Sequence, residues 1–340
     1  MPFFDNNLLS QDYDRIQWDP NNGNFKDIGR NSQLIFYLKK VLHDKKVGLV
    51  HNNQFDKNTL NQSDLDFVVF NCSDHPYDLP NFDINKPNLI LGSNFANSDY
   101  YPFHLLFSAY LANREHVVLD KPRPIVASCV NRSPRLGRIY NRILIEDFAY
   151  KDFKCLWFRA EESNGPVPDV QQMIQLLGQE NYVKFNMIDQ MSPVYQPTSE
   201  YNLCSQIHDY QDSYLNLVTE SRLENIGFLT EKIYKPIRAA QLFLVQGPPG
   251  AVNHLRTLGF DTFDDYFDHS YDTVEDWIQR TDLVHKELQR IYNQIENIFF
   301  ETPSRRQNNI RTLQNFESNN IWNNLIKNKI SENTTAIIKF

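Results

Sequence analysis

The chain has 340 residues, of which 41% are hydrophobic and 13% aromatic, so it can bury a large core and is not a disordered protein. A formal net charge of −8 argues against a wholly basic nucleic-acid-binding protein, although it does not exclude a local basic groove. The length exceeds that of one typical core, and two domains are therefore expected.

The first third of the chain alternates between helical and strand patterns. Residues 31–41 place their apolar side chains on one face, which predicts an amphipathic helix. Short apolar runs predict strands at 47–50, 66–70 and 89–92. The segment 121–124 reads Lys-Pro-Arg-Pro and is predicted to be a stiff linker, because proline fixes φ and favours an extended residue before it.

The rest of the chain continues this alternation. Strands are predicted at 125–129, 155–158, 214–218 and 241–245, and helices at 139–148, 170–177, from 230 onward, 251–258, 272–300 and 321–330. Strands that alternate with helices predict doubly wound α/β layers. We expect an N-terminal Rossmann-like domain over 1–121, a second domain over 122–300 and a helical tail over 301–340.

Other sequence signals concern the compartment. The first five residues, Met-Pro-Phe-Phe-Asp, lack the features of a signal peptide, and no apolar run approaches the ~20 residues that span a membrane. Four scattered cysteines without C-x-x-C spacing disfavour structural disulfides and a zinc site. We therefore expect a cytoplasmic protein with no membrane span. A composition with many Asn, Ile, Tyr and Phe but only 11 Gly suits an AT-rich genome, so a phage protein in the host cytoplasm is one hypothesis.

The most informative stretch is 219–237, which lies between two predicted strands. Thr230 can cap a helix whose first turn contains Glu231, where a carboxylate complements the helix dipole. The helix N-terminus would suit a diphosphate, Lys232 would add a positive charge, and Glu231 could accept hydrogen bonds from ribose hydroxyls. Ligands of open α/β sheets bind at the carboxyl ends of strands, where this loop lies. The alternative is an ordinary exposed helix start with common charged residues.

Arginines form a second cationic feature at a strand-to-helix junction. Arg132, Arg135 and Arg138 are spaced by three residues, and Pro134 suits the first turn of a helix. Because residues three apart share a helix face, Arg135 and Arg138 could converge on one anion, and guanidinium groups bind phosphate in a bidentate way. The alternative is a solvated basic helix end, or ion pairs with nearby acids.

Three segments then occur in a suggestive order. They are Ile-Val-Ala-Ser-Cys-Val-Asn-Arg-Ser-Pro-Arg from residue 125, Leu-Asn-Leu-Val-Thr-Glu-Ser followed by Gly-Phe-Leu-Thr-Glu-Lys-Ile from residue 215, and Phe-Leu-Val-Gln-Gly-Pro-Pro-Gly from residue 243. Together, over residues 122–260, they resemble the donor domain of α1,3-fucosyltransferase-like enzymes. The resemblance implies a GT-B glycosyltransferase, with two Rossmann-like domains that face each other across a cleft.

The resemblance also implies roles for individual residues. It assigns ribose binding to Glu231, phosphate binding to Lys232 and diphosphate binding to Arg135 or Arg138. It places Phe228 near the nucleoside and aligns Glu220 with the glutamate of the family's Phe-Glu-Asn-Ser segment. Here Ser221 replaces the asparagine and the loop 222–227 is longer, so the donor need not be GDP-fucose.

An inverting transfer also needs a base for the acceptor proton. The base is expected on the first domain, where Asp74, His75 and Asp78 follow a predicted strand, and Asp74 is the first choice. Asp99 and His104 are rivals, and the alternative for each is a turn-forming Asp or a core His. The sequence Asp-Leu-Asp at 64–66 has the form of a metal-binding D-x-D motif, but it precedes its strand, so we predict no metal site.

These expectations combine into one hypothesis with two alternatives. The chain would use a nucleotide-diphosphate sugar as co-substrate, with no further cofactor, to glycosylate a hydroxyl, and a saccharide is the family's usual acceptor. The first alternative is a phage enzyme that glycosylates hydroxymethylated bases in DNA, for which the basic candidates are Lys39, Lys40, Lys45, Lys46, Arg114, Lys121 and Arg123. The second alternative is a non-catalytic sugar-binding protein.

Overall fold

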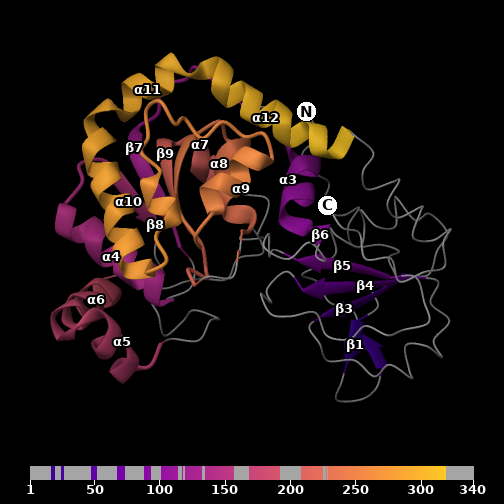
Figure 1. Cartoon of the computed structure of the whole chain (residues 1–340), viewed down its shortest axis with the longest axis horizontal. Coiled ribbons are helices and arrows are strands. Elements are labelled where there is room, and N and C mark those ends of the chain that lie inside the picture. Colours follow the sequence, from indigo (N-terminus) through magenta and orange to yellow (C-terminus); the bar gives the residue numbers. More distant parts are fainter. Residues whose placement is uncertain are drawn as a thin grey trace. The chain divides into compact units, whose positions relative to one another are not determined.

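The computed structural model divides the chain into two compact units, Met1–Phe107 with Phe316–Phe340, and Ser108–Asn315 (Figure 1). Before residue 101 the structure describes only five strands. From there it describes residues 101–113, 117, 119–131, 135–156, 168–191, 208–224, 227 and 229–318. No helix in these ranges is long and apolar enough to cross a lipid bilayer.

The first unit is built on a sheet with the strand order β2-β1-β3-β4-β5-β6. Its strands are β1 Gln17–Asp19, β2 Asn24–Lys26, β3 Val47–His51, β4 Phe67–Cys72, β5 Asn88–Gly92 and β6 Tyr101–Pro102. All neighbours pair in parallel except β1 and β2. Helix α3, Phe103–Ala112, follows β6. The three strands predicted in this region are confirmed, whereas the helix predicted at 31–41 lies outside the described residues.

The second unit contains a four-stranded parallel sheet in the order β10-β9-β7-β8. Its strands are β7 Ile125–Val130, β8 Phe153–Leu156, β9 Ser213–Thr219 and β10 Leu242–Gln246. Every residue of β9 and β10 is buried, as expected for parallel strands that are covered on both faces. The predicted α/β class with Rossmann-like parallel sheets is therefore confirmed.

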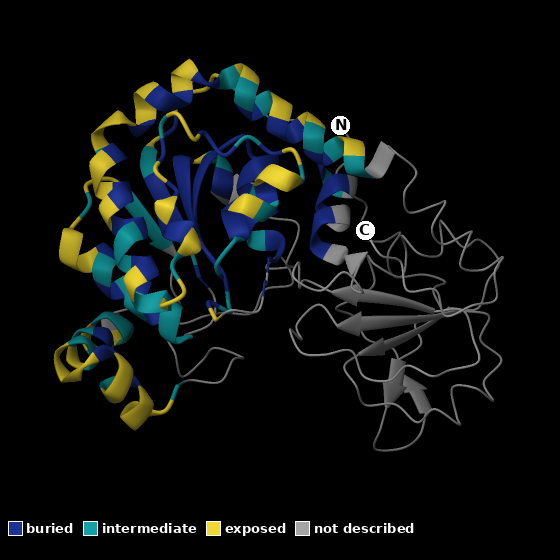
Figure 2. Cartoon of the chain, in the orientation of Figure 1, coloured by how far each residue is buried: buried dark blue, intermediate teal, exposed yellow. Residues whose placement is uncertain are grey.

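Helices cover both faces of this second sheet. The helices described from residue 136 onward are α4 Leu136–Phe148, α5 Val170–Leu177, α6 Gln179–Met191, α7 His208–Gln211, α8 Glu231–Arg238, α9 Ala251–Thr257, α10 Trp277–Ile291, α11 Ile295–Glu301 and α12 Pro303–Ser318. Of these, α4, α7, α8, α10 and α11 contact the sheet, whereas α5 and α6 pack on each other and α6 on α4. Figure 1 shows α4 and α10 on one side of the sheet and α8 on the other. In Figure 2 the strands are buried, and the exposed residues lie on the outer faces of the helices.

The order in which the chain visits these strands creates a switch point. The chain runs from β7 to β8 on one side, then returns to β9, which pairs with the other side of β7, and continues to β10. Loops that leave adjacent strands in opposite directions open a crevice at the carboxyl edge of the sheet, and open α/β proteins bind ligands there. The loops after β7 and β9 flank this point.

Two parts of the second unit differ from the sequence-based expectation. The helix predicted at 272–300 is divided into η4 Ser270–Thr273, α10, η5 Tyr292–Gln294 and α11. Asp276 separates η4 from α10, because its side chain accepts a hydrogen bond from the Gln279 N–H at 2.7 Å and caps the start of α10. Helix α6 was not predicted, because its apolar residues show no helical periodicity. The helix predicted at 321–330 lies outside the described residues.

Arg123 is a correction to the predicted basic groove. Its side chain is only 6% exposed and donates hydrogen bonds to the backbone carbonyls of Tyr210, Ser213 and Ala239 at 3.1, 2.7 and 2.8 Å. It therefore fixes the linker to the amino end of the sheet and is not available to nucleic acid. Lys121 is exposed, and the other five basic candidates lie outside the described residues.

Candidate functional site

The described candidate residues of the second unit lie in the two loops that flank the switch point. Arg135 and Arg138 follow β7, at the start of α4, whereas Glu220 and Ser221 follow β9 directly. Residues 230–232 enter α8 after the same loop. The sheet topology thus brings together two segments that are about 90 residues apart in the sequence, as the Cys129–Thr219 contact beneath them shows.

Glu220 closes the loop between β9 and α8. The residue is 1% exposed, and its N–H donates to the Gln246 carbonyl at 3.0 Å, which continues the pairing of β9 with β10. One carboxylate oxygen accepts the backbone N–H of Thr230 at 2.8 Å, and the other accepts the Thr230 hydroxyl at 2.7 Å. A buried carboxylate thereby joins two residues that lie ten positions apart and fixes where α8 begins.

Thr230 occupies the N-cap position of α8, but the predicted side-chain cap is wrong. The hydroxyl makes no capping hydrogen bond to an N–H of the helix. It donates to Glu220 and accepts a hydrogen bond from the ammonium group of Lys232 at 2.7 Å. Leaving the buried Glu220 carboxylate without donors would cost more free energy than leaving the helix without a side-chain cap, so the hydroxyl bonds the carboxylate.

Lys232 lies between two carboxylates. Its Nζ is 3.5 Å from Glu220 Oε2 and 3.4 Å from Glu231 Oε1, and its side chain is 18% exposed. Glu231 itself is nearly buried, with a side-chain exposure of 6%. The lysine therefore compensates the negative charge of the loop, while part of its side chain remains in contact with solvent.

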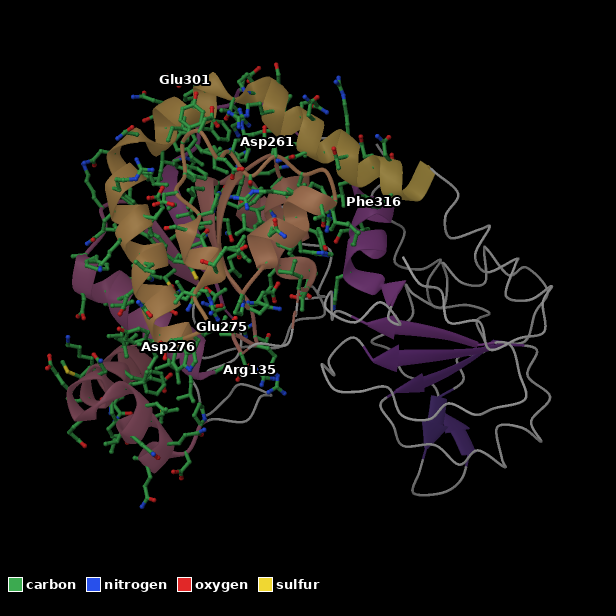
Figure 3. All side chains as sticks on the ribbon, viewed as in Figure 1. Arg135, Asp261, Glu275, Asp276, Glu301 and Phe316 are labelled. Atoms are coloured by element: carbon green, nitrogen blue, oxygen red, sulfur yellow. The ribbon has the colours of Figure 1, made fainter. Side chains whose placement is uncertain are left out.

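The two described arginines differ in their surroundings. Arg138 is 2% exposed and donates to the Ser221 hydroxyl at 2.7 Å. Burial lowers the pKa of its guanidinium to about 10, an effect that the nearby Glu220 carboxylate opposes, so the group stays charged at neutral pH. Arg135 is half-buried at the N-cap of α4 and projects from the end of the unit in Figure 3. Arg138 thus belongs to the interior wall of the site, and Arg135 to its surface.

Arg280, near the start of α10, organises the same region and was missed by the sequence analysis. It is 1% exposed and donates hydrogen bonds to four backbone carbonyls, those of Leu223, Gly247, Val274 and Glu275. An arginine on an amphipathic helix is normally interpreted as a solvated residue, and no local pattern marks it as buried.

The turn after β10 is held by Asp272. Gly250 adopts a left-handed conformation with φ of +78°, which glycine tolerates, and its N–H donates to the Asp272 carbonyl at 2.8 Å. The Asp272 carboxylate accepts the N–H groups of Val252 and Asn253, both at 2.9 Å. An internal carboxylate thus already occupies the positive end of α9.

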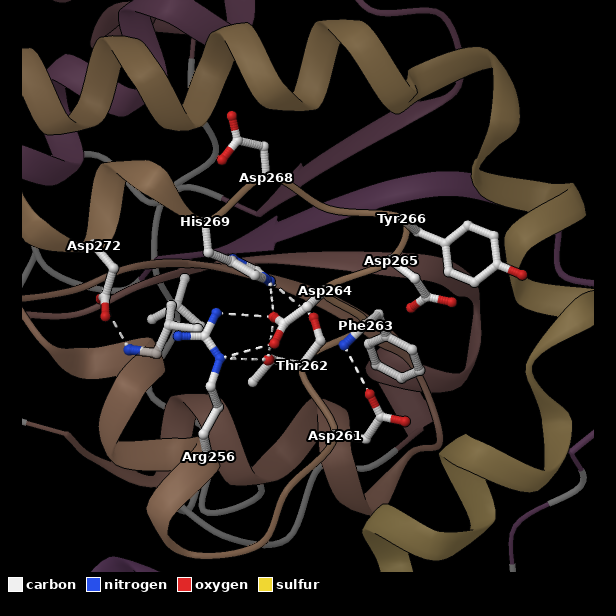
Figure 4. A network of polar contacts seen from close by, with 12 residues as sticks. Arg256, Asp261, Thr262, Phe263, Asp264, Asp265, Tyr266, Asp268, His269 and Asp272 are labelled. Carbon is white, nitrogen blue, oxygen red and sulfur yellow. Dashed lines mark hydrogen bonds and ion pairs between the residues drawn. The ribbon is translucent and has the colours of Figure 1, made fainter.

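A separate hollow of about 640 Å³ lies over the loop 264–270. It is lined by Arg256, Arg290 and the residues of that loop, and none of the predicted site residues contributes to it. Figure 4 shows its polar network, in which Arg256 contacts the Asp264 carboxylate at 2.8 and 2.9 Å and His269 contacts the Thr262 carbonyl at 2.8 Å. Arg256 pairs with Asp264, Arg290 with Glu287 and Asp265 with Arg305, so these charges serve the local fold.

Several predicted residues lie outside the described part of the chain. They are Asp74, His75, Asp78, Phe228, Asp99, Arg132, Asp64 and Asp66. His104 is buried within α3 and 6% exposed. Within the described ranges, no three His, Cys, Asp or Glu side chains gather as metal ligands.

Comparisons with known proteins give matches of structure but not of sequence. No protein-family model and no curated protein matches the chain. A DNA-modifying β-glucosyltransferase, solved with and without its substrate uridine diphosphoglucose, matches at 12% identity with a TM-score of 0.45, over 84% of this chain and 81% of that one. An α1,3-fucosyltransferase matches at 14% identity with a TM-score of 0.38, over 85% and 79%. OtsA in its apo form matches at 12% with a TM-score of 0.36, over 92% and 80%.

Proposed function

We propose that this chain is a glycosyltransferase that moves a sugar from a nucleotide-diphosphate donor to a hydroxyl acceptor. The observation that carries the proposal is the position of the two loops at the switch point of the second sheet. These loops combine cationic side chains, Arg135 and Lys232, with the carboxylate of Glu231. A nucleoside diphosphate needs both kinds of group, because cations bind its phosphates and a carboxylate accepts hydrogen bonds from its ribose.

The geometry favours two roles for the site residues: some bind the donor and others hold the loops in place. Arg135 is at the surface, and we assign it to the diphosphate, together with Lys232. Glu231 would bind the ribose, and Phe228 would contact the nucleoside. Glu220 already uses both carboxylate oxygens to hold Thr230, and Arg138 is buried against Ser221, so these two residues shape the site.

The reaction would be a single displacement with inversion. The acceptor oxygen forms a bond to the anomeric carbon while the bond from that carbon to the diphosphate oxygen breaks. A base takes the proton of the acceptor hydroxyl, and the cations stabilise the negative charge of the leaving diphosphate. We propose Asp74 as the base, with His75 and Asp78 as the alternatives, and no role for a metal ion.

A saccharide is the acceptor that we favour. Modified DNA would require a basic groove, and the burial of Arg123 removes one member of the predicted set. A DNA-modifying role predicts binding that weakens steeply with salt, because phosphate contacts release counterions. A sugar-binding protein without activity predicts donor binding without turnover.

The test is release of nucleoside diphosphate from a panel of nucleotide sugars in the presence of EDTA. Each donor is offered with a mixture of saccharides and, separately, with DNA that contains hydroxymethylated bases. We expect release with saccharides, loss of release in Asp74→Asn with donor binding retained, and full release in Asp99→Asn. Turnover only with the modified DNA would establish the alternative acceptor, and absence of donor binding would refute the proposal.

A further inference from the structure

We propose that Arg280 is the positioning residue that holds the donor-site loop in its binding geometry. The inference rests on the proposed function and extends it to a residue that lies outside every motif of the sequence. Arg280 belongs to the first turn of α10 and is among the largest fully buried side chains of the chain, with 1% of its surface exposed.

The guanidinium joins three separate segments of backbone. Its Nε donates to the carbonyl of Gly247, at the end of β10, at 2.9 Å. Its Nη2 donates to the carbonyl of Leu223, in the loop after β9, and its Nη1 donates to Val274 and to Glu275, the latter at 3.1 Å. Only a planar fork with several N–H groups can serve these carbonyls at once, whereas a lysine ammonium presents a single head.

The same loop residue contacts the arginine junction. The side chain of Leu223 packs so closely on Gly137, in the first turn of α4, that a Cβ atom there would lie 2.1 Å from Leu223 Cδ1. Gln246 donates to the Gly137 carbonyl at 3.3 Å and to the hydroxyl of Thr281, the neighbour of Arg280, at 2.6 Å. Arg280 therefore sets the distance between the loop that begins at Glu220 and the start of α4.

The electrostatic surroundings of Arg280 are consistent with a charged group that has a structural role. Burial lowers the pKa of Arg280, and the acidic side chains of Asp272, Glu275, Asp276 and Glu224 oppose that effect. All the hydrogen bonds that Arg280 donates in this structure go to backbone carbonyls. Its guanidinium therefore holds main-chain segments in place.

Arg306 offers a matched control at the other end of the sheet. It is also 1% exposed, and it donates to the carbonyls of Leu119, Ala240 and Phe299 at 3.1, 2.9 and 2.9 Å. Ala240 precedes β10, whereas Gly247 follows it, so the two arginines serve opposite ends of that strand. In Figure 3, Arg135 and Glu275 mark one end of this unit and Glu301 marks the other.

The experiment compares Arg280→Lys with Arg306→Lys in the full chain. Three quantities are measured: the free energy of unfolding, amide hydrogen exchange of peptides that cover residues 220–230, and the Kd for UDP, GDP and ADP. Both variants should lose stability. Only Arg280→Lys should accelerate exchange in the loop and weaken the best nucleotide by about tenfold or more, while Arg306→Lys should leave the Kd within about twofold of the wild type.

The outcomes separate the two ideas. Equal loop exchange in both variants would overturn the positioning role, whatever the nucleotide affinity. If the wild type binds none of the three nucleotides, the proposed donor site fails, and the exchange comparison still decides whether Arg280 holds the loop. If Arg280→Lys does not fold, Arg280→Gln serves as the second variant, because its amide has too few N–H groups to serve all the carbonyls that Arg280 bonds, and wild-type exchange of the loop in that variant would refute the inference.

Discussion

Both carboxylate oxygens of Glu220 accept hydrogen bonds from Thr230, one from its backbone N–H at 2.8 Å and one from its hydroxyl at 2.7 Å. This pair sets the start of α8 and therefore the positions of Glu231 and Lys232. In an aligned family motif the two residues would each be assigned to a ligand. In the structure they form hydrogen bonds with each other. We therefore assign donor binding to the neighbouring Glu231 and Lys232.

Substitution of Thr230 tests this pairing. Thr230→Val keeps the shape but removes the hydroxyl, so Glu220 Oε2 loses a donor and Lys232 loses an acceptor. We expect a loss of about 1–3 kcal/mol in the free energy of unfolding, measured by chemical denaturation, because a buried acceptor is left unsatisfied. Thr230→Ser keeps the hydroxyl and should lose less than about half of that amount. A loss in Thr230→Ser as large as that in Thr230→Val would contradict the prediction, because the serine keeps the hydroxyl that bonds Glu220.

Lys232 and Glu220 should be energetically coupled. The 3.5 Å contact lies in a partly buried setting, where removal of one partner leaves a buried charge without compensation. In a double-mutant cycle with Lys232→Gln and Glu220→Gln, we expect the double variant to be more stable than the sum of the single losses by at least about 0.5 kcal/mol. Strict additivity would mean that the two charges do not interact.

Gly137 should resist substitution although it lies in a helix. Alanine is intrinsically the better helix former by about 1 kcal/mol, but its Cβ would clash with Leu223 Cδ1. We therefore expect Gly137→Ala to lower the melting temperature of the wild type. The same substitution should lower it less in a Leu223→Ala background, where the clashing side chain is gone. A Gly137→Ala variant that is more stable than the wild type would show that Leu223 can turn away freely.

Acid should destabilise the second unit through the buried His285 and the half-buried His254. Burial lowers the pKa of His285 to about 3 and that of His254 to about 4, below the value of about 6.5 for an exposed histidine. As the pH falls below about 6.5, the unfolded chain binds protons that the folded chain does not, so stability decreases by up to about 1.4 kcal/mol per pH unit for each histidine. Above about pH 7 both states are neutral and these residues contribute no pH dependence.

The variant His285→Gln isolates this effect. His285 Nε2 lies 2.7 Å from the Asn141 side-chain oxygen, and a glutamine amide can donate to the same atom. Measured by denaturation between pH 4 and 7, the stability of His285→Gln should depend less steeply on pH than that of the wild type. The same slope in both proteins would place the acid sensitivity in other groups, such as the carboxylates whose pKa values are lowered by ion pairs.

The sequence predicts the strands of the second sheet well, because the apolar runs of β9 and β10 leave one interpretation, whereas the strand order that creates the switch point comes from the structure. It fails at α6, where Tyr182, Phe185 and Ile188 pack on one face while Val183 and Met187 are exposed, so that the apolar residues show no helical periodicity. It also predicts one helix where Asp276 starts a new one, since a cap inside a long periodic stretch is not distinguishable from an exposed acid.

The candidate site shows a similar limit. The residue types in the loops after β7 and β9 indicate anion binding, and the topology brings those loops to one edge of the sheet. The sequence cannot tell which charges remain for a ligand, because that depends on the path of the loop. Thr230 was expected to cap α8 and instead bonds Glu220, and Arg280 had no motif because its acceptors are carbonyls of distant segments.

The central claim is that the loops at the switch point bind the diphosphate of a nucleotide sugar. The most direct measurement is a calorimetric titration of UDP, GDP and ADP into the wild type, Arg135→Gln and Arg256→Gln. Arg256 is an exposed arginine that pairs with Asp264 beside the separate hollow, so it controls for the loss of one positive charge. We expect at least one nucleotide to bind the wild type and Arg256→Gln equally, and to bind Arg135→Gln about tenfold more weakly or worse. Equal affinity of all three proteins, or no binding to the wild type, would contradict the account.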